Sequence, residues 1–101
     1  MAEALILEFE GVGRDEYEAV NELLGIDVGS GEGEWPEGLL IHTAGATENG
    51  WAVLEVWESR EAQERFMNER LGQALQEGGV GGPPSRAEWL DVAAHHTPGS
   101  S

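Results

Sequence analysis

The sequence predicts an α+β fold built on a four-stranded antiparallel sheet. Segments with the apolar periodicity of strands alternate with segments that have the periodicity of helices, and glycine-rich stretches separate them. An Asn-Gly pair between the two central strand-like segments indicates a hairpin. With 101 residues, the chain is long enough for one domain but too short for two cores. We place this domain at residues 1–94 and expect residues 95–101 to form a flexible tail.

The first half of the chain predicts a strand, a helix and a long loop. Residues 4–9 form a short apolar run typical of a strand that is mostly buried on both faces. Residues 14–24 carry apolar side chains at helical spacing with acidic residues opposite them, and Gly25 marks the end of this helix. Residues 25–38 contain five glycines, one proline and four acids, which predicts a loop that is either a flexible connector or a lid.

Residues 39–44 and 51–57 predict the central hairpin. If Asn49 and Gly50 are the two turn residues, His42 lies opposite Trp57. A four-residue loop instead places His42 opposite Glu55. In both registers His42 and Glu55 lie on the same face of the sheet, and the other face is nearly all apolar.

The last part of the chain predicts a second helix and a fourth strand. Ser59 is a suitable N-cap, and apolar side chains recur at helical spacing from residue 62 to residue 75, with a division of the helix expected at Gly72. Glycines and prolines at 78–84 end the helix, and 87–92 form a short strand. The order strand, helix, strand, strand, helix, strand is that of a ferredoxin-like α+β unit.

Composition excludes several classes of function. The chain has 5 Lys+Arg and 20 Asp+Glu, which gives a net charge of −15 and disfavours binding to nucleic acid or to an anionic membrane surface. The absence of cysteine excludes disulfides and thiolate sites. The first residues have no basic region and only a three-residue apolar run, so we expect a cytoplasmic protein without a signal peptide or membrane span.

One segment resembles a known family. The run Glu55-Val-Trp57-Glu-Ser59 followed by a helix is similar to the strand-to-helix junction of antibiotic biosynthesis monooxygenase-like proteins in the dimeric α+β barrel superfamily. The stretch Arg-Leu-Gly-Gln-Ala-Leu-Gln at 70–76 resembles a pattern found in many small actinobacterial proteins of unassigned function. The resemblance in specific residues spans about 42–76, and the resemblance in topology spans the whole chain.

The resemblance implies a homodimer in which two four-stranded sheets pack face to face as a closed barrel. Such proteins include monooxygenases of polyketide quinones that need no cofactor, haem-degrading enzymes, cyclases, isomerases and non-catalytic binders. Haem degradation is disfavoured, because Phe66 stands where that branch has a tryptophan and the first strand has no asparagine. A sheet with helices on one face also leaves an apolar face that a second copy of the chain would bury.

His42 and Glu55 are the candidate catalytic pair. A carboxylate beside an imidazole can act as a general base, so His42 would remove or shuttle a proton while Glu55 orients it. The alternative is a structural pair that bridges strands or subunits. No spacing of ligands predicts a metal site, since the neighbouring His95 and His96 point apart on an extended tail.

Five further residues are candidates for binding a substrate. Tyr17 could direct its hydroxyl into a pocket, Trp35 could anchor the lid, and Arg70 could hold an anionic group. Trp57 and Phe66 could stack on an aromatic ligand. Each has a structural alternative: core packing for the aromatic residues and a surface ion pair for Arg70.

The sequence therefore predicts a homodimer that binds a small apolar or aromatic molecule. Our hypothesis is a cofactor-independent monooxygenase, or an isomerase or cyclase, in which the carbanion of the substrate reacts with oxygen or rearranges. A non-catalytic binding or sensing module with the same pocket is the alternative, and a structural dimer without a ligand is a third reading.

Overall fold

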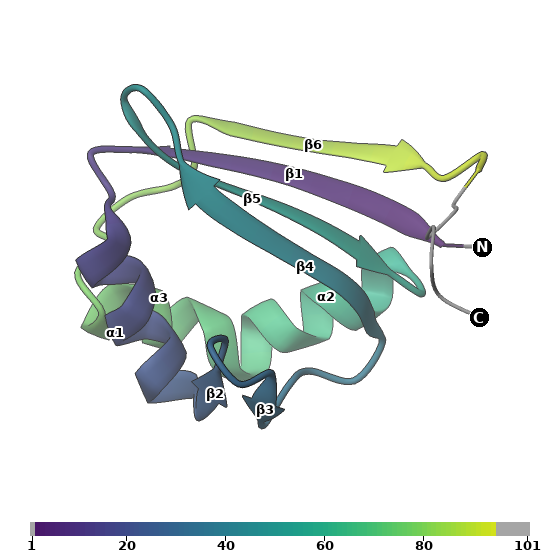
Figure 1. Ribbon diagram of the computed structural model, residues 1–101. Helices are drawn as coiled ribbons and strands as arrows, with labels where there is room; N and C mark the ends of the chain where they lie inside the picture. Colours follow the sequence, from purple (N-terminus) through teal and green to yellow (C-terminus); the bar gives the residue numbers. More distant parts are fainter. Residues whose placement is uncertain (1, 95–101) are drawn as a thin grey trace.

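A layer of helices covers one face of a twisted antiparallel sheet, and the other face is left open (Figure 1). This computed structural model describes residues 2–94. The predicted tail at 95–101, with the pair His95 and His96, lies outside the described residues. In the described part of the chain, no helix is long and apolar enough to cross a membrane.

The sheet has the strand order β4-β5-β1-β6. Its strands are β1 (Glu3–Glu10), β4 (Leu39–Ala46), β5 (Gly50–Trp57) and β6 (Arg86–Asp91). All neighbouring strands are antiparallel. Together with the two predicted helical regions, these strands confirm the α+β class and the ferredoxin-like order of elements.

Helix α1 (Arg14–Leu24) has the bounds that its apolar periodicity predicts. The side chain of Glu16 accepts a hydrogen bond of 2.7 Å from the N–H of Gly13, which pairs one of the free donors at the start of the helix. At the other end, Gly25 has φ 77°, a left-handed conformation that glycine adopts without a steric penalty. Local sequence therefore sets both ends of this helix.

The second helical region runs through three segments: α2 (Arg60–Phe66), the π-helical η1 (Met67–Leu71) and α3 (Gly72–Glu77). The Ser59 side chain caps α2 by accepting a bond of 3.2 Å from the N–H of Ala62, as predicted. The predicted division corresponds to the boundary between η1 and α3, where the wide π turn ends at Leu71. Gly72 keeps a helical backbone conformation, so the helix is not interrupted there. Wide turns of this kind often occur at functional sites.

The predicted loop at 25–38 contains a small hairpin of β2 (Ile26–Asp27) and β3 (Glu32–Gly33). The Asp27 side chain accepts bonds from the N–H groups of Gly29 and Ser30. The Ser30 hydroxyl together with these two N–H groups lowers the pKa of Asp27. Gly33 has φ 118°, and a Cβ there would overlap the carbonyl oxygen of Gly25. The segment is therefore ordered by short-range hydrogen bonds and lies next to the helices (Figure 1).

The β4–β5 hairpin uses the register that places His42 opposite Glu55. Its turn is one residue earlier than the Asn-Gly pair suggests, since the N–H of Thr47 bonds the carbonyl of Gly50 and leaves residues 48 and 49 as the turn. Gly50 is required for a tertiary reason: a Cβ there would overlap the carbonyl oxygen of Phe9 on β1. The close approach of β1 therefore favours glycine at this position.

The helix-facing side of the sheet holds the core, and the outer side is partly exposed. Leu5, Trp51 and Trp57 face the helices and are 0–4 % exposed. An irregularity between Leu39 and Ile41 turns Leu40 outward, although the alternation predicts it on the side of His42. The register places Ala4, Ile6, Ile41, Leu54, Val56 and Leu90 on the outer side.

Candidate functional site

A cavity of about 80 Å³ lies between the sheet and the helices. Its walls are mostly apolar, and they come from β1, α1, the 25–38 segment, β4, β5 and the second helical region. Among the lining residues, the only ionisable side chains are Tyr17, His42 and Glu55. These three ionisable side chains thus lie in an otherwise mostly apolar pocket, which is the usual composition of a small-molecule site.

These three side chains form one hydrogen-bonded chain. The Tyr17 hydroxyl lies 2.6 Å from Nε2 of His42, and Nδ1 of His42 lies 2.8 Å from Oε2 of Glu55. An ionised Glu55 can only accept, so Nδ1 carries a proton, and the Nε2 of a neutral imidazole then accepts the Tyr17 O–H. The arrangement connects α1, β4 and β5 through side chains alone.

Trp57 lies behind the hydrogen-bonded side chains and orients Glu55. Its indole Nε1 donates to Oε1 of Glu55 over 3.1 Å, and the Trp57 side chain is completely buried. Both oxygens of Glu55 are therefore bonded, one to the imidazole and one to the indole. Because Trp57 itself is not among the cavity-lining residues, its contact with the site runs through Glu55.

The environment of Tyr17 favours its neutral form. Burial raises the pKa of the Tyr17 hydroxyl, the nearby amide of Asn21 opposes this change, and the charge of Glu55 raises the pKa further. The Asn21 amide is close enough to lower the pKa of the hydroxyl, but its Nδ2 has no hydrogen-bond partner. At neutral pH Tyr17 is thus a hydroxyl that can pass a proton to His42.

Ile26, Trp35 and Pro36 form the cavity wall that the 25–38 segment contributes. The Trp35 ring centroid lies 5.6 Å from that of His42, and its Nε1 donates to the carbonyl of Gly31. Arg70 holds the same segment from outside: its guanidinium donates to the carbonyls of Leu24 and Glu34 over 2.7 and 2.8 Å. Arg70 is therefore a clamp between α1 and this segment.

The structure brings together five of the seven predicted site residues. Tyr17, Trp35, His42, Glu55 and Phe66 line the cavity. Trp57 and Arg70 do not, because the first is buried behind Glu55 and the second is bonded to backbone carbonyls. The roles proposed for these side chains in catalysis and binding stay predictions.

Sequence reasoning missed Asn21 and the π-helical segment. Asn21 is a buried polar residue that lines the cavity on the apolar face of α1, one turn after Tyr17. Its signal was a polar side chain at an apolar position of the helical pattern. Met67 and Leu71 also line the cavity, from the two ends of η1. Within residues 2–94 no group of three or more acidic or histidine side chains could hold a metal ion.

Two solved structures share this architecture. The ActVA-Orf6 monooxygenase of Streptomyces coelicolor, in complex with the ligand nanaomycin D, is 24% identical with a TM-score of 0.54, over 96% of this chain and 91% of that one. The chain therefore shares the ferredoxin-like α+β fold of that protein. A putative antibiotic biosynthesis monooxygenase from Bacteroides thetaiotaomicron is 19% identical with a TM-score of 0.50, over 100% of this chain and 93% of that one. No protein-family model and no curated protein matches the sequence.

Proposed function

We propose that the cavity binds a small, largely apolar or aromatic molecule and that the protein oxidises it as a cofactor-independent monooxygenase. The observation that carries this proposal is the Tyr17–His42–Glu55 chain, which links a cavity hydroxyl to a base and a carboxylate. Few polar groups in an apolar pocket suit a substrate that is itself apolar except at its reacting centre.

The proton path follows from the hydrogen bonds. Both nitrogens of His42 are occupied, so a proton that leaves the substrate reaches Tyr17 first while the Tyr17 proton moves to Nε2 of His42. Glu55 then stabilises the resulting imidazolium. In this reaction Tyr17 and His42 are the catalytic residues, Glu55 orients the imidazole, and Trp57 holds Glu55 in place.

The oxidation balances with molecular oxygen as the second substrate. The carbanion left by proton removal forms a C–O bond with oxygen, and a returned proton gives a hydroperoxide. Loss of water then breaks the O–O bond and the second C–H bond. One CH2 group and one oxygen molecule thus become one carbonyl group and one water, with the substrate supplying all the electrons.

Deuterium exchange tests the proton-transfer step without requiring the natural substrate. We expect the protein to accelerate exchange of the protons next to the carbonyl of 2-indanone in deuterium oxide, followed by NMR. His42→Ala should reduce the catalysed rate by roughly 10²-fold or more, the usual contribution of a general base. Thr43→Ala, an exposed neighbour on the same strand, is the control and should leave the rate unchanged. A His42→Ala protein that is folded and keeps the rate would overturn the proposal.

The second candidate function is a non-catalytic binder or sensor. One observation favours it: His42 has no free nitrogen facing the cavity, since Tyr17 and Glu55 occupy both. In a binder this chain of bonds would only fix the shape of the pocket. Binding of 2-indanone without accelerated exchange or oxygen uptake would select this alternative.

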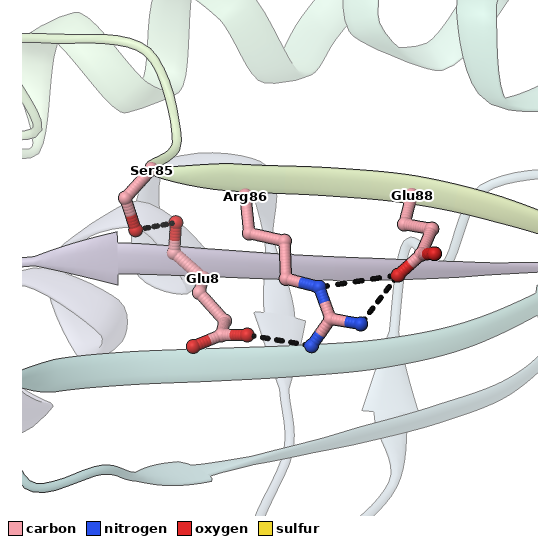
Figure 2. Close-up of polar contacts among 4 residues, drawn as sticks. All are labelled: Glu8, Ser85, Arg86 and Glu88. Carbon is pink, nitrogen blue, oxygen red and sulfur yellow. Dashed lines mark hydrogen bonds and ion pairs between the residues drawn. The ribbon is translucent and has the colours of Figure 1, made fainter.

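The outer face of the sheet supports a homodimer. Leu54 and Leu90 are 45% and 44% exposed there, and every helix lies on the other face (Figure 1). At one end of this face the Arg86 guanidinium bonds the carboxylates of Glu8 and Glu88, and Ser85 bonds the backbone carbonyl of Glu8 (Figure 2). These charges are paired within one chain, which lowers the cost of placing them at the rim of a subunit interface. A second copy would bury the apolar remainder.

A further inference from the structure

Two buried side-chain nitrogens in residues 2–94 lack a hydrogen-bond partner, and both belong to residues that line the cavity. They are Nδ2 of Asn21 and Nε1 of Trp51. Buried donors are nearly always paired, because an unpaired one has lost its bonds to water without replacement. Two such donors around one cavity indicate a group that the chain itself does not provide.

The two donors flank the proton-transfer chain. Asn21 lies one helical turn after Tyr17 on α1, so the two side chains share a face of the helix. The ring of Trp51, at the start of β5, packs against the Tyr17 ring with centroids 5.0 Å apart. A ligand that reaches the Tyr17 hydroxyl is therefore also close to an amide on one wall and an indole on the other.

The chemistry of the donors selects the ligand. An indole N–H can only donate, and the free atom of Asn21 is also a donor, so the matching ligand atom is an acceptor. The cavity lining in the described chain contains no lysine or arginine, while it does contain Glu55. A neutral carbonyl oxygen suits such a site better than a carboxylate or a phosphate, which would bring an uncompensated negative charge.

We propose that Asn21 and Trp51 form a carbonyl-binding subsite, so that the ligand is a cyclic or aromatic ketone. This inference rests on the proposed function, because the same two donors would hold the oxygen on which negative charge develops when Tyr17 removes a neighbouring proton. Donors fixed in advance around such an oxygen stabilise the charged state without reorganising. Asn21 and Trp51 would thus contribute both to the choice of ligand and to the proton transfer.

A matched pair of ligands tests the subsite. The probes are 2-indanone and indane, which have the same ring skeleton with and without the carbonyl group. We expect the protein to bind 2-indanone more tightly than indane by about tenfold or more in ligand-detected NMR titrations, in line with about one hydrogen bond. Asn21→Leu and Trp51→Phe should each reduce this preference while leaving the affinity for indane within about twofold. Leu23→Met changes an exposed residue of α1 outside the cavity lining and should keep the preference.

Thermal unfolding provides an independent measurement. Asn21→Leu replaces an unpaired buried amide by an apolar side chain of similar size, so its unfolding temperature should equal or exceed that of the parent protein. A clear decrease in the unfolding temperature would mean that the amide has a structural role, and it would overturn the subsite. Failure of 2-indanone to bind, or equal binding of 2-indanone and indane, would overturn it as well. If the preference for the ketone depends on both donors but no exchange is catalysed, the subsite stands and the monooxygenase proposal fails. If exchange is catalysed equally by the donor variants, the subsite fails and the proton-transfer proposal stands.

Discussion

The Tyr17 hydroxyl oxygen lies 2.6 Å from Nε2 of His42, which joins the first helix to the edge strand β4 through a single hydrogen bond. Because the other nitrogen of His42 bonds Glu55, the imidazole can take a proton from the cavity only through Tyr17. This relationship makes the protein's one tyrosine the outermost member of the proton path, and it gives that path a spectroscopic reporter.

Titration of Tyr17 should show its environment directly. Burial and the charge of Glu55 raise its folded-state pKa above the ordinary value of about 10, so the neutral hydroxyl contributes to stability. This contribution is complete below the unfolded-state pKa and is lost as the pH rises through the higher folded-state pKa. We expect the tyrosinate absorbance of the folded protein to appear at higher pH than that of the protein in denaturant. A midpoint at or below the unfolded one would contradict the geometry.

Removing the Tyr17 hydroxyl should weaken the site more than the fold. We expect Tyr17→Phe to cost about 1 kcal/mol in the free energy of unfolding at neutral pH, the value of one hydrogen bond, and to remove the alkaline loss of stability described above. Catalysed exchange of 2-indanone should fall to the level of His42→Ala. Chemical denaturation at two pH values, with the exchange assay, checks both results; an unchanged exchange rate would show that His42 acts without Tyr17.

Trp57→Phe should disturb the site through Glu55. The substitution removes the N–H that Oε1 of Glu55 accepts and leaves a gap at a fully buried position. We expect a loss of about 3 kcal/mol in the free energy of unfolding, together with an altered pH profile of the exchange reaction. Trp89→Phe is the matched control, since Trp89 also packs on the core but makes no bond to Glu55. The idea fails if both variants change the pH profile alike.

Arg70→Met should loosen the 25–38 segment. The variant keeps an apolar stem but loses the bonds to the carbonyls of Leu24 and Glu34. We expect a loss of about 1–3 kcal/mol and faster amide hydrogen exchange in residues 25–38. Arg65→Met removes the same charge from an exposed neighbouring position and should change neither. Equal exchange in the two variants would mean that Arg70 is not the clamp.

A charge on the outer face should separate the expected dimer. Leu54→Glu places a carboxylate in the middle of the exposed apolar face, where burial against a second copy would be costly. We expect the molar mass in solution, measured by light scattering, to fall from that of two chains to that of one. Leu23→Glu is a suitable control, because Leu23 is 51% exposed but lies on α1. A parent protein that is already a monomer would contradict the dimer.

Local patterns in the sequence were sufficient to predict where the helices and strands occur along the chain. Helix α1 ends where its periodicity and Gly25 predict, because hydrogen bonds within one turn and a left-handed glycine determine both ends. The Ser59 cap follows in the same way from residues that are close in the chain. These features could be predicted because their energetics involve neighbours a few residues apart.

The sequence by itself therefore determined the α+β class, the order of the elements and the common face of His42 and Glu55. Only the tertiary structure decided that Tyr17 closes a chain with them, that Trp57 lies behind Glu55, and that Asn21 and Trp51 leave two donors at the cavity. It also showed that Gly50 is needed by the neighbouring β1. These facts depend on contacts between segments that are distant in the chain, and the geometry of such contacts is set by the packing of whole elements, which no local pattern encodes.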